Sequence, residues 1–101
     1  MQDYKNIIEM ENILDNHKKI TDNLNKALDE FLSSQKSYKK SVDYYHSEQF
    51  QIDYDRSNNN LIDKDIKCGV LSQDAIYDLI GENFNTAIKM LEIATKIIKE
   101  H

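Results

Sequence analysis

Cys68 and His46 are the residues of this chain best suited by type to covalent chemistry. A nucleophilic cysteine needs a base within hydrogen-bond reach and a lowered pKa. Cys68 follows Lys67 and lies just before an expected helix start, and His46 belongs to the same central segment, so a Cys/His pair is conceivable. No nucleophile motif or glycine-rich phosphate loop accompanies them. We therefore predict no enzyme activity, no catalytic residue and no small-molecule substrate.

A metal or cofactor site is equally poorly supported. The alternating oxygen side chains that begin with Asp53 and Asp55 resemble the start of a calcium loop. However, Asn58 stands where that loop needs glycine, and Lys64 stands where it needs a bidentate glutamate. His17 is a lone imidazole on an apolar seam, where a packing role is expected. The sequence predicts neither a metal nor a cofactor.

Acidic residues are concentrated in the middle of the chain. The net charge is −5, from 18 acidic and 13 basic residues, and residues 1–42 are balanced with seven of each sign. Residues 43–65 hold six acidic residues against two basic ones. Such a surface repels phosphate backbones, which argues against nucleic acid, and it suits a basic protein partner. The partner-binding candidates are Asp43, Glu48, Asp53, Asp55, Asp63 and Asp65.

The elements that carry these residues are predicted to be helices. The chain has no proline and two glycines, which favours long uninterrupted helices and an all-α fold. Eleven positions at three-four spacing form a heptad seam, which indicates a helix over 4–46 that packs against another helix. The seam consists of Ile7, Met10, Leu14, His17, Thr21, Leu24, Leu28, Phe31, Tyr38, Val42 and Tyr45.

A second helix is expected over 72–99. Ser72 can cap its first N–H groups, and Asp74 places negative charge where the helix dipole favours it. Gly81 lowers the local helix propensity and allows a kink. Between the helices, residues 47–71 lack periodicity, and the polar run 53–60 has side chains that favour turns over helix. We expect an ordered acidic connector there.

Two segments of the central block resemble a known family. They are Tyr44-Tyr-His-Ser-Glu-Gln-Phe50, followed by Asp53, and Lys67-Cys-Gly-Val-Leu-Ser-Gln-Asp-Ala-Ile-Tyr-Asp-Leu-Ile80. The pattern is similar to a bacterial domain-of-unknown-function family, number forty-two ninety-eight, of small helical proteins. Phe50 and Gln73 depart from the tryptophan and glutamate usual in that family. The resemblance implies the helical fold over nearly the whole chain and no particular function.

The same block has a physical interpretation as a structural motif. Gly69 suits a positive φ, and Val70 and Leu71 can plug one end of the helix pair. The aromatic residues near them form either a structural cap or a binding surface, and we favour the cap. The aromatic group is Tyr44, Tyr45, Phe50, Tyr54 and Tyr77, and the remaining motif residues are Gly69, Val70, Leu71, Ser72 and Asp74.

The predicted architecture is a single domain, an antiparallel hairpin of two helices. Because the first helix is longer, part of its seam lacks a partner, which predicts a homodimer with four helices or a heteromeric partner. The single cysteine and the absence of an apolar leader or membrane span indicate a cytoplasmic protein. We expect a non-enzymatic bacterial interaction or adaptor protein. The alternative is an inhibitor encoded by a phage or mobile element, of the anti-CRISPR or toxin-immunity type, whose acidic surface blocks a basic site on its target.

Overall fold

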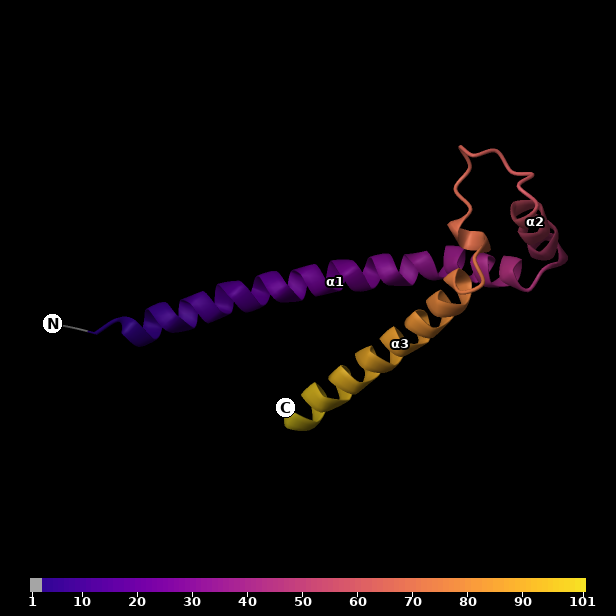
Figure 1. Cartoon of the computed structure of the whole chain (residues 1–101). Coiled ribbons are helices and arrows are strands. Elements are labelled where there is room, and N and C mark those ends of the chain that lie inside the picture. The colour runs from indigo at the N-terminus through magenta and orange to yellow at the C-terminus, as the bar shows by residue number, and fades with distance from the viewer. Residues whose placement is uncertain (1–2) are drawn as a thin grey trace. The chain divides into compact units, whose positions relative to one another are not determined.

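The computed structural model describes residues 3–101, and every regular element in this range is helical. In chain order these are α1 (Lys5–Tyr45), α2 (Glu48–Asn58), the short 3-10 helix η1 (Gly69–Leu71) and α3 (Ala75–Glu100) (Figure 1). The predicted all-α fold with a long first helix is confirmed. The chain divides into two units between Tyr38 and Lys39. No helix in the described range is long and apolar enough to cross a membrane.

The first unit is the long N-terminal part of α1. The Asp3 carboxylate accepts a hydrogen bond of 2.9 Å from the Lys5 N–H, which satisfies one of the free donors at the helix start. From there α1 runs for 41 residues, about 60 Å, without a break at the serine-rich stretch 33–37. None of its residues is buried. A lone amphipathic helix of this kind gains its stability from packing against something else.

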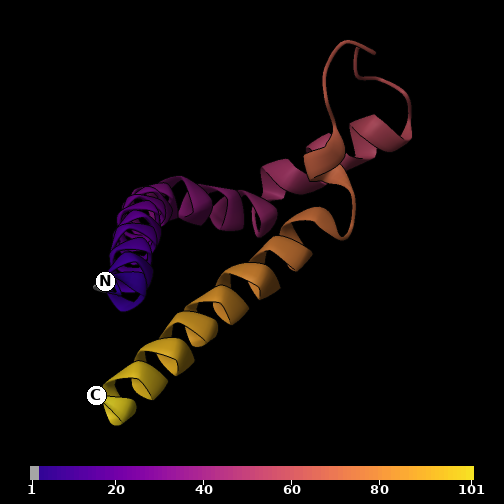
Figure 2. The ribbon, with the colours of Figure 1, turned by 90° about the vertical axis from the view of Figure 1, so that its left-hand side faces the viewer.

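The second unit has a very small core. Figures 1 and 2 show the loop that leaves the end of α2 and returns to η1, and η1 contacts both α2 and α3. Leu71 of η1, 7% exposed, and Ile76 of α3, 2% exposed, are the buried apolar residues of the described range. The Leu71 N–H donates to the Cys68 carbonyl at 2.9 Å, which closes the turn that carries Leu71 inward.

The expectation of a non-helical connector over 47–71 was wrong for its first half. Ser47 caps α2, because its Oγ accepts a hydrogen bond of 3.2 Å from the Phe50 N–H. Along α2, side-chain hydrogen bonds at four-residue spacing then offset the low helix propensity, as Gln51 donates to Asp55 at 3.1 Å. The asparagine triplet does act as a terminator. Asn60 takes a positive φ of 56°, a conformation that asparagine tolerates after a helix end.

The start of α3 differs in detail from the prediction. The helix begins at Ala75 and not at residue 72, although Ser72 does cap it, because its Oγ accepts from the Ala75 N–H at 3.2 Å. Asp74 is the last residue before the helix and its side chain makes no cap bond. The positive φ expected at Gly69 is also wrong, since Gly69 lies in η1 with a negative φ. α3 continues through Gly81 to Glu100. The kink, the antiparallel hairpin and the dimer stay predictions.

Candidate functional site

Four aromatic rings gather where the end of α1 meets α2. The Phe50 ring is central, with ring centroids 5.4 Å from Tyr44 and 5.2 Å from Tyr45, both in edge-to-face geometry. The Tyr54 ring stacks on the Phe50 ring, with 6.2 Å between the ring centroids. Edge-to-face and offset-stacked pairs are the favourable arrangements of aromatic rings. The short turn at His46 and Ser47 makes this possible, because it turns the chain back within two residues. The predicted aromatic group is thus present for these four residues.

Asp53 joins the same two helices through hydrogen bonds. The Tyr44 hydroxyl donates to Asp53 Oδ2 at 2.6 Å, the Gln49 amide donates to Oδ1 at 2.9 Å, and Arg56 Nη1 lies 3.8 Å from Oδ1. The hydrogen bond from Tyr44, followed by that from Gln49, lowers the pKa of the Asp53 carboxyl. Partial burial, followed by the bond to this carboxylate, raises the pKa of Tyr44 to about 12. The Asp53 carboxylate is therefore half-buried and already bonded to groups of its own chain.

An open hollow of about 340 Å³ lies beside the aromatic rings. Its lining consists of Tyr45, Phe50, Gln51, Tyr54 and Gln73. The Gln73 amide donates to the Tyr54 hydroxyl at 3.4 Å, so a residue of the short segment between η1 and α3 closes one side. Aromatic faces attract cations, and the amide oxygens accept hydrogen bonds from ammonium or guanidinium groups. The hollow is therefore suited to a basic side chain.

Carboxylates stand next to this hollow. Gln51, which lines it, donates a hydrogen bond to Asp55, and Glu48 lies seven residues before Asp55, two turns along the same side of α2. Both acidic residues are exposed, as are the remaining candidates Asp43, Asp63 and Asp65. Of the six candidates, Asp53 alone is held inward. The site therefore combines aromatic rings with accessible negative charge.

Comparison with known protein families identifies this chain. The family model for a domain of unknown function, DUF4298, matches residues 7–93. The chain belongs to this family. The match includes all of α2, η1 and the aromatic group, in agreement with the resemblance seen in the central block. No curated protein and no solved structure matches the chain.

In this DUF4298 chain, Cys68 and His46 engage different neighbours. Cys68 Sγ donates to the Ile66 carbonyl at 3.4 Å and lines a separate, mostly apolar cavity of about 330 Å³. The His46 ring lies 5.2 Å from the Tyr45 ring in edge-to-face geometry. The described residues contain no group of three or more His, Cys, Asp or Glu side chains that could hold a metal. The first part of the run that resembled a calcium loop, residues 53–58, lies in helix α2, where alternate side chains point in different directions.

The DUF4298 motif residues after the loop take different positions from those expected. Tyr77 is 67% exposed and lies outside the aromatic group, because its neighbour Ile76 is the residue that α3 turns inward. Val70 is 44% exposed whereas Leu71 is buried, and the plug at one end of the helix pair stays a prediction. Sequence reasoning missed Gln51 and Gln73 as lining residues. The four-residue spacing from Gln51 to Asp55 was the available signal for the first, whereas Gln73 reaches the site by tertiary folding.

Proposed function

We propose that this protein is a non-enzymatic interaction protein, a small cytoplasmic bacterial adaptor that binds a basic surface of another protein. The observation that supports this most is the open hollow formed by Tyr45, Phe50 and Tyr54 beside the exposed carboxylates of Glu48 and Asp55. Aromatic rings and acidic groups side by side are the surroundings that a lysine or arginine side chain prefers.

The physics of such binding divides between the two kinds of group. The aliphatic stem of a lysine or arginine packs on the rings, and its charge over a ring face contributes roughly 0.5–2 kcal/mol. The carboxylates of residues 43–65 attract a basic protein from a distance and raise its association rate, an effect that added salt weakens. The partner's basic side chain therefore makes its close contacts at the hollow beside α2. The acidic residues of 43–65 favour a partner whose surface is positively charged.

The site is preorganised for this contact in the absence of a partner. Asp53 fixes α2 against the end of α1 through Tyr44, and Phe50 fills the space between the rings. A surface whose rotamers are already set loses less entropy on binding than a flexible one. This explains why Asp53 faces inward while its acidic neighbours Glu48 and Asp55 remain exposed.

The test is capture of a partner from the native host with the wild-type chain and two matched variants. Glu48→Gln with Asp55→Asn removes two carboxylates beside the hollow. Glu11→Gln with Asp22→Asn removes two exposed carboxylates from α1 and serves as the control with the same net charge. We expect a basic partner that the wild type and the control retain, that the α2 variant loses, and whose binding weakens with salt. A partner retained equally by both variants and insensitive to salt would refute the proposal.

The alternative function, inhibition of a nuclease or toxin by a phage-borne or mobile-element protein, uses the same surface. There the acidic residues occupy the basic site of the target. Capture of a nuclease or toxin whose activity falls when the purified chain is added supports the inhibitor. A housekeeping protein as the salt-sensitive partner supports the adaptor.

A further inference from the structure

Helix α3 has an apolar surface that is much wider than one neighbouring helix can cover. Successive residues of an α-helix lie about 100° apart around its axis. On this basis all seven charged residues of α3, from Asp78 to Glu100, fall within one sector about 100° wide. The remaining arc of about 220° runs from Ile93 through Ala87 to Ile88, and two threonines and one asparagine are its polar members. A surface helix packed on one side has an apolar stripe of roughly 100° or a little more.

The described residues of this chain supply one helix that can match α3 in length. α3 has 26 residues and spans about 39 Å, whereas α2 has 11 residues and spans about 16 Å. α1 is long enough, but a single helix covers one side of the arc. Even with α1 on one side of the arc, the other side would have no partner of matching length among the described helices.

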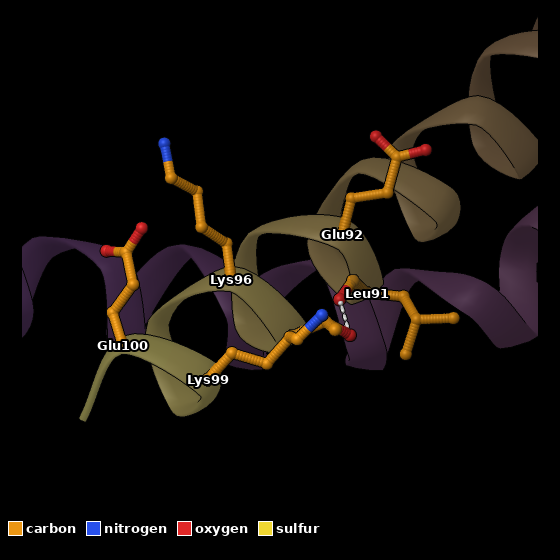
Figure 3. A pocket seen from close by; sticks show the side chains of 6 residues that line it. Leu91, Glu92, Lys96, Lys99 and Glu100 are labelled. Carbon is orange, nitrogen blue, oxygen red and sulfur yellow. Dashed lines mark hydrogen bonds between the residues drawn. The ribbon is translucent and has the colours of Figure 1, made fainter.

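The side chains on α3 confirm that this surface is not covered by the core of the second unit. Eight large apolar side chains of α3 are exposed, from Tyr77 to Ile98, and only Ile76 is buried. The hollow along the last turns is lined by six residues that all belong to α3 (Figure 3). In that view the Leu91 side chain leaves the helix in a different direction from those of Glu92 and Lys96. Four of the six lining residues are charged and belong to the charged sector, so the evidence for an open apolar face is the exposure of the eight apolar side chains.

We infer that a second copy of this chain covers the free side of α3. The area is sufficient, because the eight exposed apolar side chains of α3 and nine more on α1 offer on the order of 1,000 Å² per chain. A stable interface needs about 800 Å² per partner, and the largest apolar patch of a monomer is usually roughly 300–600 Å².

The charges favour a second copy over a partner of opposite charge. α1 carries seven acidic and seven basic residues, and α3 carries four acidic and three basic ones. Two copies therefore meet without strong repulsion along the helices, and neither helix selects a basic or an acidic partner. The surplus of negative charge lies in residues 43–65, which belong to the acidic surface on and around α2. Self-association and the proposed partner binding thus use different surfaces.

The first test is the mass of the purified full chain by light scattering on a sizing column, over a range of concentrations. We expect a dimer of roughly 24 kDa, twice the chain mass of 11.9 kDa. Crosslinking of mixed isotope-labelled and unlabelled chains should then give mixed-label peptides that contain α3. A mass of 11.9 kDa at every concentration, or crosslinked α3 peptides of a single label, would overturn the inference.

Substitutions on the two sides of the arc locate the contact. One variant combines Leu79→Gln with Ile93→Gln, and the other combines Tyr77→Gln with Ile88→Gln. We expect at least one pair to raise the dimer dissociation constant tenfold or more, with the helical circular dichroism retained at high concentration. Glu92→Gln with Lys96→Gln, in the charged sector, leaves the net charge unchanged and should leave the constant unchanged. A dimer that neither apolar pair weakens contradicts the inference, because its interface then lies elsewhere.

Discussion

Ile76 is the most buried residue of the described range, so its truncation to alanine tests the small core most sharply. The side chain is 2% exposed, and Ile76→Ala removes three buried carbons. At about 0.8 kcal/mol for each, the lost transfer free energy is about 2.4 kcal/mol. The cavity left behind adds to this loss, and the better helix propensity of alanine returns a few tenths of a kcal/mol. We expect the free energy of unfolding to fall by about 2–3 kcal/mol.

Urea unfolding followed by far-UV circular dichroism measures this change. Protein concentration must be the same for all samples, because self-association adds to the apparent stability. Ile52→Ala on α2 is the control, since Ile52 is 50% exposed and its truncation should cost well under 1 kcal/mol. The reasoning fails if Ile76→Ala costs less than about 1 kcal/mol, or no more than the control.

Three further predictions concern the junction of α1 and α2. Of the six tyrosines, one should ionise near pH 12 in the folded protein, with the burial-raised pKa of Tyr44, and Tyr44→Phe should remove that step from an alkaline absorbance titration. The folded-state pKa of Asp53 is below its ordinary value of 3.8, so the ionised carboxylate stabilises the fold above pH 3.8 and this effect is lost as the pH falls through the lowered pKa. The stability of Asp53→Asn should therefore depend less steeply on pH in the acid range than that of the wild type. An equally steep dependence would contradict this. Ser47→Ala should destabilise the protein by about 1 kcal/mol in the same urea assay, whereas Ser47→Asp, which keeps a capping oxygen, should not.

The helices at the two ends of the chain were predictable because their signals are local. The heptad seam from Ile7 to Tyr45 and the absence of glycine and proline in that stretch specify α1 directly. The start of α3 was predicted to within three residues because the hydrogen bond from the Ala75 N–H to the Ser72 Oγ joins residues that are close in sequence. Periodicity and capping depend on near neighbours, so they can be read from one sequence.

The connector was harder because its helix is stabilised by contacts that cross elements. The run from Asp53 to Asn60 has poor helix propensity, and α2 forms there with help from Tyr44 at the end of α1 and from rings that meet only after the turn. The same holds for the site. The acidic residues were visible in the sequence, but the inward position of Asp53 and the approach of Gln73 to Tyr54 follow from tertiary folding.

Amide hydrogen exchange of the full chain, measured above and below the concentration at which it associates, tests whether a second copy covers α3. The amides of α3 should lose protection on dilution, because their cover is a second copy. The amides of α2 should keep theirs, because the aromatic group and Asp53 hold that helix within one chain. Protection of α3 that is the same at every concentration would contradict the account.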